Sequence, residues 1–214
     1  MASQSEPACK KCRREGVQLY LKGSKCHSVK CPLDSKGGKY RNTVPGMHGP
    51  TTQRKLSDYG QQLREKQKLK RIYGLREKQF SNNVAEAVRR PGVTGENLLM
   101  LLEIRLDNIA YRLGFAASRK QARQFVNHGH IQVNGKRVNI PSYKVKVGDV
   151  IEVCESSREH KFLKDCIAAT QGKNAPKWLS VDCDNFKGVV ESLPERADID
   201  TLVEEQLIVE YYSR

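Results

Sequence analysis

Long apolar runs are absent from this sequence. Its longest uninterrupted apolar run covers only residues 98–102, whereas a membrane-spanning helix needs about 20 residues. The N-terminal residues are polar and lack the apolar stretch of a secretion signal. We therefore expect the chain in a cytoplasm or in an organelle of bacterial descent.

Acidic side chains are few compared with basic ones. The 214 residues include 38 Lys and Arg but only 24 Asp and Glu, which gives a formal charge of +14. Residues 1–90 carry +14, residues 91–180 carry +6 and residues 181–214 carry −6. Solubility alone usually needs a net charge of about 2–8, whereas cations that neutralise phosphates gain free energy from released counterions. The excess predicts a nucleic-acid partner, and we expect the acidic tail to pack on the basic part or to face a protein.

Motifs of catalysis are also missing. The sequence has no Gly-rich phosphate loop, His-Glu metal motif or nucleophile elbow. Arg105-Leu106-Asp107 matches a short motif of pseudouridine synthases, but it falls within an expected helix, where Asp107 is expected to orient a basic residue. We therefore expect no enzyme. The alternative is an RNA-modifying enzyme or a ribosome-rescue factor that uses a helix-hairpin RNA-binding module.

The seven cysteines do not suggest a disulfide framework, because their number is odd and the expected compartment is reducing. Four of them have the spacing of a structural zinc site with tetrahedral thiolate ligands: Cys9, Cys12, Cys26 and Cys31. An iron–sulfur cluster and four free thiols are the alternatives, and His27 is a possible substitute ligand. The other three, Cys154, Cys166 and Cys183, lack paired spacing and are expected to be buried thiols.

Several local patterns predict helices. Residues 1–50 are rich in Gly and Pro and are expected to be irregular. Residues 57–90 are expected to form two helices divided at Gly74, with Ser57 as the N-cap of the first. Leu99, Leu102, Leu106, Ile109 and Leu113 predict one helix over residues 97–113, ended by Gly114. Ser118 and Gln121 form a capping-box pattern that opens a helix to about His128.

A small sheet is expected to follow. Asn134-Gly135 lies between the apolar segments 131–133 and 138–140 and predicts a β-hairpin, because both turn residues need a positive φ. A third strand is expected over residues 150–153. A helix is expected over residues 162–169, and the apolar, aromatic end of the chain is expected to dock on a domain.

Basic and polar side chains on these elements are candidates for RNA contact, since structured RNA is recognised mainly through phosphates and shape. Arg64, Lys68 and Arg71 form a ridge at helical spacing. The full set of candidates is Arg64, Lys68, Arg71, Arg105, Ser118, Arg119, Lys120, Arg123, His128, Asn134, Lys136 and Arg137.

Motifs along nearly the whole chain carry a family resemblance. They include Lys22-Gly23, Arg71-Ile72-Tyr73-Gly74, Arg105-Leu106-Asp107-Asn108, Val133-Asn134-Gly135, Pro141-Ser142-Tyr143 and the C-terminal Glu205-Gln206-Leu207. In their order the chain closely resembles the bacterial small-subunit ribosomal protein S-four family.

The resemblance implies an α+β fold. A mainly helical first domain would have an irregular, zinc-stapled N-terminal arm, and a small RNA-binding module of two helices and a twisted antiparallel sheet would be inserted in it. The expected parts are the arm at 1–45, the helical domain at 46–97 plus 181–214, and the module at 98–180. The resemblance also implies primary binding to the 5′ domain of 16S rRNA, contact with ribosomal protein S-five, a place near the mRNA entry path, and structural Zn²⁺ on the four paired cysteines.

Overall fold

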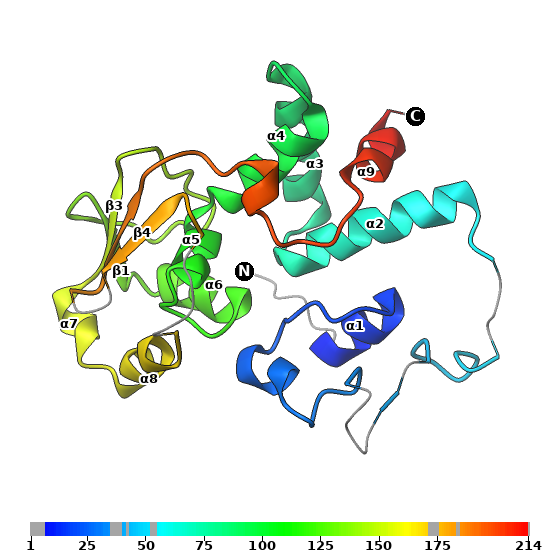
Figure 1. The fold of residues 1–214 in the computed structure, drawn as a ribbon, viewed down its shortest axis with the longest axis horizontal. Coiled ribbons are helices and arrows are strands. Elements are labelled where there is room, and N and C mark those ends of the chain that lie inside the picture. Colours follow the sequence, from blue (N-terminus) through cyan, green and yellow to red (C-terminus); the bar gives the residue numbers. More distant parts are fainter. Residues whose placement is uncertain are drawn as a thin grey trace. The chain divides into compact units, whose positions relative to one another are not determined.

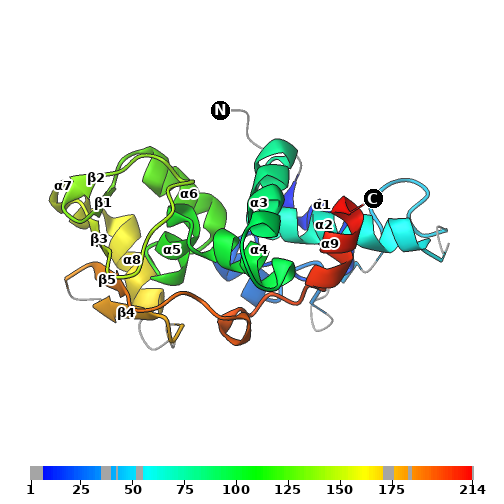
Figure 2. The same ribbon diagram turned by 90° about the horizontal axis from the view of Figure 1, so that it is seen from above.

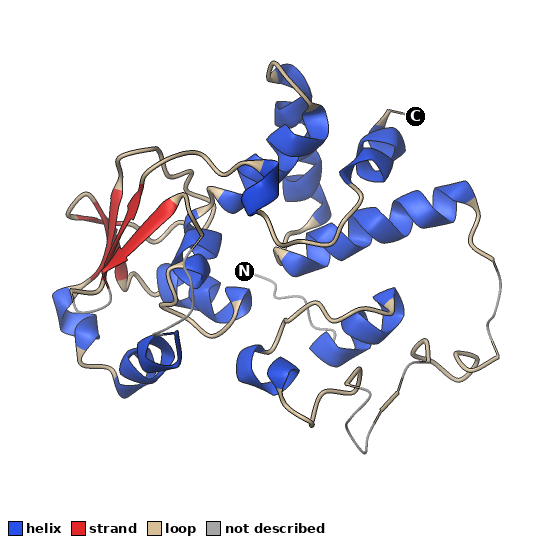
Figure 3. Cartoon of the chain, in the orientation of Figure 1, coloured by secondary structure: helices blue, strands red, loops and turns tan. Residues whose placement is uncertain are grey.

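The computed structural model describes residues 7–34, 40–41, 43–51, 55–170, 176–182 and 185–213, without the side chains of residues 162, 169 and 170. Within these ranges helices dominate, and five short strands form one antiparallel sheet (Figure 3). The helices are α1 (Ala8–Glu15), η1 (Gly23–His27), α2 (Asp58–Ile72), α3 (Glu77–Arg89), α4 (Thr94–Glu103), α5 (Leu106–Arg112), α6 (Arg119–Asn127), α7 (Glu155–Arg158), α8 (Lys161–Thr170), η2 (Arg196–Asp198) and α9 (Glu205–Tyr212). The strands are β1 (Ile131–Val133), β2 (Lys136–Arg137), β3 (Val150–Val153), β4 (Leu179–Asp182) and β5 (Lys187–Val190). The expected α+β class is confirmed.

The predicted pair of helices after residue 57 is confirmed. The Ser57 hydroxyl accepts a hydrogen bond from the Gly60 N–H at 3.2 Å and so satisfies a free donor of the first turn of α2. Gly74 follows α2 with φ +65, a conformation that other residues adopt only at a cost, and α3 begins at Glu77. The helix over residues 162–169 is also confirmed, as α8.

The single helix expected over residues 97–113 is wrong, because the chain breaks between α4 and α5. Arg105 has extended backbone angles, φ −71 and ψ 138. The Leu106 N–H donates to the Tyr143 carbonyl at 2.9 Å, and the Asp107 N–H donates to the Pro141 carbonyl at 3.1 Å. The loop at residues 141–143 thus provides acceptors for the free N–H groups of a new helix. The apolar stripe stays buried on both helices, which explains why its periodicity hid the break.

The N-terminal segment is less irregular than expected, since α1 and η1 occur within residues 1–50. α1 begins after Pro7 and ends at Glu15, and the next residue, Gly16, has φ +70. Pro before a helix and Gly after it are the usual boundary residues. The many Gly and Pro residues nearby obscured this short helix in the sequence.

The predicted hairpin forms at Asn134-Gly135, whose φ angles are +50 and +76. Its second strand is shorter and earlier than expected: β2 is Lys136–Arg137 rather than 138–140. The Val138 N–H still donates to the Ile131 carbonyl at 3.0 Å. The chain then leaves the sheet toward the loop that caps α5.

Two strands of the sheet were not predicted. The strand order is β2-β1-β3-β5-β4, and every neighbouring pair is antiparallel. β5 pairs with β3, and at Gly188 an added Cβ would overlap the Leu113 side chain. A glycine therefore permits the close approach of this strand to α5.

The chain divides into two compact units, residues 1–82 with 202–214 and residues 83–201. These limits differ from the expected ones in three respects. The first stretch of the helical unit ends at residue 82 rather than 97, so residues 83–97 belong to the second unit. The arm belongs to the same unit as α2, because α1 packs on that helix. The return to the helical unit comes at residue 202 rather than 181, because β4 and β5 complete the sheet of the second unit.

In the first unit the C-terminal helix α9 packs on α2, so two segments that are far apart in the sequence lie side by side (Figure 1). Tyr59 and Tyr211 bring their rings to 5.6 Å between centroids, and Phe80 and Tyr212 to 6.2 Å. Ile208 on α9 and Leu69 on α2 are fully buried. The predicted docking of the aromatic chain end is confirmed.

The second unit has one apolar core between its sheet and its helices. α5, α6 and α8 contribute to it together with β1, β3, β4 and β5 (Figure 2). Trp178, the single tryptophan, is 1% exposed within this core. Among the described residues no helix is long and apolar enough to cross a membrane.

Candidate nucleic-acid interface

Helix α6 starts with a side-chain cap close to the predicted one. The Ser118 hydroxyl accepts from the Gln121 N–H at 3.4 Å, and the Gln121 side-chain oxygen accepts from the Ala117 N–H at 2.9 Å. The return bond therefore comes from the residue before the cap, not from the cap itself as in a regular capping box. Ser118 is buried and occupied in this cap, which makes it part of the support of α6.

A buried polar network lies beneath α6. Glu103 is fully buried and accepts from the Asn108 side chain at 2.6 Å. It also accepts from the Arg112 guanidinium at 2.9 and 3.0 Å. Such a charge stays buried only because its acceptor sites are filled.

A second buried ion pair confirms that Asp107 orients a basic residue. Arg105 donates two hydrogen bonds to the Asp107 carboxylate, at 3.1 and 2.9 Å. Both side chains are at most 6% exposed. Arg123 on α6 lies 3.8 Å from the same carboxylate. Arg105 is therefore turned inward, away from any solution partner.

Arg119 is also held by neighbours in the same unit. Its guanidinium lies 4.7 Å from the Tyr111 ring centroid, a cation–π contact, and donates to the Asn108 side chain at 2.8 Å. It lies 3.9 Å from Glu103. Its side chain is 15% exposed. Part of the predicted basic face of α6 therefore contacts other residues of the second unit instead of solvent.

Other candidates of the module are exposed. Lys120 on α6, His128 at its end and Lys136 in β2 are open to solvent. Arg137 donates to the Gly129 carbonyl at 2.5 Å and to the His128 carbonyl at 3.1 Å. This holds the hairpin against the end of α6. The exposed part of the predicted set therefore lies on α6 and on the hairpin that follows it.

Asn134 has a structural task at the tip of this hairpin. Its side-chain oxygen accepts from the Val150 N–H at 2.9 Å, and its amide donates to Asp149 at 2.8 Å. The two turns of the sheet are thereby tied together. Asn134 was predicted both as a turn residue and as an RNA contact, and the turn role is confirmed.

Three histidines gather beside this surface. The His130 ring stacks on Phe125 at 4.7 Å and lies 5.9 Å from His128 and 5.6 Å from His160, measured between ring centroids. The Ser157 hydroxyl is 2.8 Å from His130 Nδ1. Burial lowers the pKa of His130, and the neighbouring histidines lower it further. These effects disfavour the protonated form of His130, whose ring packs on Phe125 and lies within hydrogen-bonding distance of Ser157.

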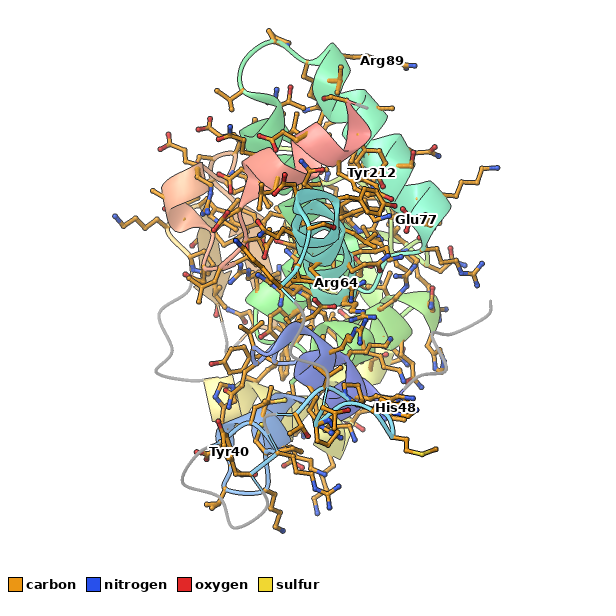
Figure 4. All side chains as sticks on the ribbon, turned by 90° about the vertical axis from the view of Figure 1, so that its right-hand side faces the viewer. Tyr40, His48, Arg64, Glu77, Arg89 and Tyr212 are labelled. Carbon is orange, nitrogen blue, oxygen red and sulfur yellow. The ribbon has the colours of Figure 1, made fainter. Side chains whose placement is uncertain are left out.

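The predicted ridge on α2 faces a carboxylate that the sequence did not reveal. Glu15, at the end of α1, has a side chain only 1% exposed and pairs with Arg64 at 3.3 Å and with Arg71. Figure 4 labels Arg64 on α2. Lys68 pairs with Glu65 on its own helix. Two cations of the predicted ridge therefore pair with a carboxylate from another helix, and the third pairs with one on its own helix.

Burial raises the pKa of Glu15, while the charges of Arg64 and Arg71 oppose this rise. No local pattern in the sequence could have linked Glu15 to α2, since 49 residues separate it from Arg64. The contact depends on how α1 packs on α2.

Exposed cations outside the predicted set lie elsewhere in both units. In the first unit they include Lys10, Arg14, Lys22, Lys25, Lys30 and Arg41. In the second unit they include Lys146, Lys161 and Lys164. The only sign of them in the sequence is its composition, because 38 basic and 24 acidic side chains leave many cations without an acidic partner in the chain.

The four paired cysteines come together although they are distant in sequence. Cys9, Cys12, Cys26 and Cys31 all line one small cavity of about 20 Å³. His27, the possible substitute ligand, does not line it. Cys183 lies outside the described residues, and the other two isolated cysteines, Cys154 and Cys166, are buried as expected.

Polar N–H groups point at the sulfur atoms of this cavity. The Lys22 N–H donates to Cys26 at 3.3 Å, and the Gln18 amide donates to Cys31 at 3.7 Å. Burial raises the pKa of Cys12, as do the nearby thiols, while a hydrogen bond from the Leu19 backbone lowers it. Four thiols that oppose one another's ionisation and receive N–H donors are a donor set suited to a thiophilic cation. Within the described ranges, however, no three Cys, His, Asp or Glu side chains are already arranged to hold a metal ion.

The capped helix, the hairpin behind it and the exposed cations of both units define the class of this chain as an RNA-binding protein. Comparison with known proteins identifies the family. The family model "Ribosomal protein S4/S9 N-terminal domain" matches residues 4–103, and the "S4 domain" model matches residues 104–151.

Curated relatives match from end to end. Small ribosomal subunit protein uS4 of Natranaerobius thermophilus is 54% identical, uS4A of Symbiobacterium thermophilum 56% and uS4 of Nitrosospira multiformis 52%. Each match spans 214 residues, all of this chain and all of the relative. The chain therefore belongs to the uS4 family of the small ribosomal subunit. It is a structural rRNA-binding protein and not an enzyme, and the alternative of an RNA-modifying enzyme or rescue factor finds no support.

Proposed function

We propose that this chain is a primary binder of 16S rRNA that nucleates assembly of the small subunit at a junction of helices in the 5′ domain. It would act stoichiometrically, with exposed cations placed on phosphates of packed RNA helices. The A-form major groove is too narrow for side chains, so shape and backbone would be recognised rather than base sequence.

The observation that carries this proposal is that the basic side chains of the module fall into two groups, one buried in ion pairs and one exposed to solvent. Arg105 is buried in an ion pair, whereas Lys120 on α6 and Lys136 in the hairpin are exposed. A buried network thus positions α6 on the module, and a second set of cations is exposed where phosphates can bind.

The test is binding of the chain to a 5′-domain fragment of 16S rRNA over a range of salt concentrations. Lys120→Glu with Lys136→Glu should weaken binding by several kcal/mol, at about 1.5–3 kcal/mol per charge-assisted contact. It should also reduce the slope of log K against log salt by about 0.7–0.9 for each phosphate that is no longer neutralised. The matched control, Lys120→Arg with Lys136→Arg, keeps the charges and should keep the affinity. Equal affinity of the glutamate variant and the wild type would refute the proposal.

We also propose that the acidic end of the chain faces proteins. Glu191, Glu195 and Asp200 are exposed in the second unit, and Glu204 and Glu210 are exposed in the first. Basic ribosomal proteins would complement these acids, and the family resemblance points to ribosomal protein S-five and to a place near the mRNA entry path. Carboxylate-to-lysine cross-linking of purified small subunits, followed by mass spectrometry, tests this. Absence of cross-links from these acids to S-five would contradict it.

We further propose that Cys9, Cys12, Cys26 and Cys31 hold structural Zn²⁺. The shared cavity and the N–H donors directed at its sulfurs support this. Zinc bound there would cross-link α1 to the segment around η1. Metal analysis should find about one zinc per chain and no iron. Cys26→Ser should lower the zinc content. Cys166→Ser, which changes an isolated buried thiol, is the control. A purified chain that contains no zinc would contradict this part of the proposal.

The place of action follows from the assembly. We propose that the chain resides in ribosomes of the cytoplasm or of an organelle of bacterial descent. It should stay with the small subunit in sucrose gradients after a high-salt wash, as a stoichiometric component does. Release at that step would indicate a transient factor instead.

A further inference from the structure

An exposed aromatic pair stands out on the N-terminal segment. The Tyr20 and His27 rings stack with their centroids 5.1 Å apart and their planes 22° from parallel. Tyr20 is 44% exposed, and His27 is also open to solvent. The pair therefore presents an aromatic surface to the outside rather than filling a core.

Tyr20 also has an unfavourable backbone conformation. Among the described residues other than glycine, only Tyr20, Asn134 and Phe186 have positive φ, at +50, +50 and +56. A bulky residue in this region is strained, and such strain persists where the surrounding structure or a function maintains it. Asn134 serves a hairpin turn, and the Phe186 side chain packs against the core of the second unit. Tyr20 has neither explanation, because its ring is exposed.

The neighbours of Tyr20 show what maintains its position. Leu19, just before it, is buried, and its backbone N–H bonds to Cys12. The Lys22 N–H, two residues after Tyr20, donates a hydrogen bond to the Cys26 sulfur. Tyr20 thus lies between two points where the chain is fastened to the cysteine cavity, and its ring projects outward.

The surroundings of the pair are basic. Lys22, Lys25 and Lys30 are exposed on the same short segment as Tyr20 and His27. Aromatic rings flanked by cations are the combination with which proteins hold unpaired nucleotides, because each base has a face that stacks and each phosphate needs a counter-charge. A protein partner would be expected to match the exposed ring with apolar side chains, and three lysines in this short segment disfavour such a surface.

We infer that Tyr20 and His27 form a stacking platform for an unpaired base of the bound rRNA, with Lys22 and Lys25 on the adjacent phosphates. This inference rests on the proposed rRNA binding and adds to it a contact that depends on a ring rather than on charge. The platform lies in the first unit, apart in sequence from the α6–hairpin surface of the second.

The test distinguishes a role of the Tyr20 ring in RNA binding from a role in the stability of the fold. Asparagine tolerates positive φ better than other non-glycine residues, so Tyr20→Asn keeps the backbone conformation and removes the ring. We expect its thermal midpoint to equal or exceed that of the wild type. Its affinity for the 5′-domain fragment of 16S rRNA should fall about tenfold or more, the loss typical of one stacked base. The salt slope should not change, since every phosphate contact remains in place.

Two further variants complete the comparison. Tyr20→Trp keeps a stacking ring and should restore most of the affinity. Lys25→Ala should lower both the affinity and the salt slope, the latter by about 0.7–0.9 for one phosphate contact. Chemical probing should show an unpaired base that is protected by the wild type and by Tyr20→Trp but reactive with Tyr20→Asn.

Each outcome decides between the two claims. If the wild type itself binds the fragment weakly and without salt dependence, the proposed function fails. If the wild type binds tightly and a folded Tyr20→Asn variant binds equally well, the platform alone is overturned. A variant that loses thermal stability and affinity together would show that the ring supports the fold, which also overturns the platform.

Discussion

Glu77 makes one of the polar contacts that hold the C-terminal helix on the first unit, and its replacement by glutamine should weaken that contact. Lys66 and Lys70 each donate to the Glu77 carboxylate at 2.6 Å, and the Tyr212 hydroxyl donates to it at 3.0 Å. Figure 4 labels Glu77 at the start of α3 and Tyr212 near it on α9. Lys66 also lies 4.5 Å from the Tyr211 ring centroid. One carboxylate thus joins α2, α3 and α9.

The size of the effect follows from the titration of this carboxylate. Burial acts to raise the pKa of Glu77, but the hydrogen bonds from Lys66, Lys70 and Tyr212 outweigh it and lower the pKa from 4.5 to about 2. At 1.36 kcal/mol per pKa unit this corresponds to about 3 kcal/mol. The Glu77 side chain is 50% exposed, so solvent screening reduces the contribution to about 1 kcal/mol.

We expect Glu77→Gln to lower the free energy of unfolding by about 1–2 kcal/mol at pH 7, where Lys66 also loses its charged partner. For a chain of this length the melting temperature should fall by about 2–4 °C per kcal/mol. A group with a depressed folded pKa stabilises above its unfolded pKa and loses that effect as pH falls toward its folded pKa. The difference between variant and wild type should therefore be full above pH 4.5 and vanish as the pH falls toward about 2.

Asp58→Asn is the matched control. Asp58 is an exposed carboxylate in the first turn of α2, as Glu77 is in the first turn of α3, so both have the same favourable place in the helix dipole. Thermal unfolding of both variants between pH 2 and pH 7, followed by circular dichroism, is the assay. Equal losses in the two variants, or a Glu77→Gln loss that persists at pH 2, would refute the reasoning.

Three further substitutions test the second unit. Gly188→Ala should lower the free energy of unfolding in urea by about 1–3 kcal/mol, because the added Cβ would overlap the Leu113 side chain. An unchanged urea midpoint would contradict this, since it would mean that the strand moves aside at no cost. Asp107→Asn should cost about 3 kcal/mol, because it leaves Arg105 buried without a counter-charge, and a loss below that of an exposed Asp→Asn change would contradict this. Ser118→Ala should cost about 1 kcal/mol through the lost cap of α6, and calorimetry showing no loss would mean that the Gln121 bond to the Ala117 N–H suffices.

Local signals were sufficient for much of the fold. Ser57 and Ser118 cap helices as predicted, Gly74 separates two of them, and Asn134-Gly135 forms the hairpin turn. Each of these assignments depends on hydrogen bonds or backbone angles within a few residues, which a short stretch of sequence encodes. The apolar stripe over residues 99–113 likewise identified side chains that are buried.

The sequence also determined the kind of partner. The charge of +14 and its concentration in the first 90 residues predicted nucleic acid without any structural input. The order of motifs along the chain predicted the family, and the matches over all 214 residues confirm it.

Only the tertiary structure decided which basic side chains face solvent. Arg64 and Arg71 look like a free ridge in sequence, yet both pair with Glu15 on α1. Arg105 is enclosed with Asp107, whereas Lys120 stays exposed. Helical periodicity gives the direction of a side chain relative to its own helix, but it does not say which other segment will pack there.

The same reason explains the break at Arg105 and the two strands that were missed. The break depends on carbonyl groups of residues 141–143, and β5 is recognisable only by its pairing with β3 and its contact with Leu113. These acceptors and partners lie far away along the chain, so their effect arises only once the elements pack. Helix caps and turns could therefore be predicted from the sequence, because they depend on residues a few positions apart. The exposure of the basic side chains, the pairing of the strands and the clustering of the four cysteines depend on contacts between distant segments.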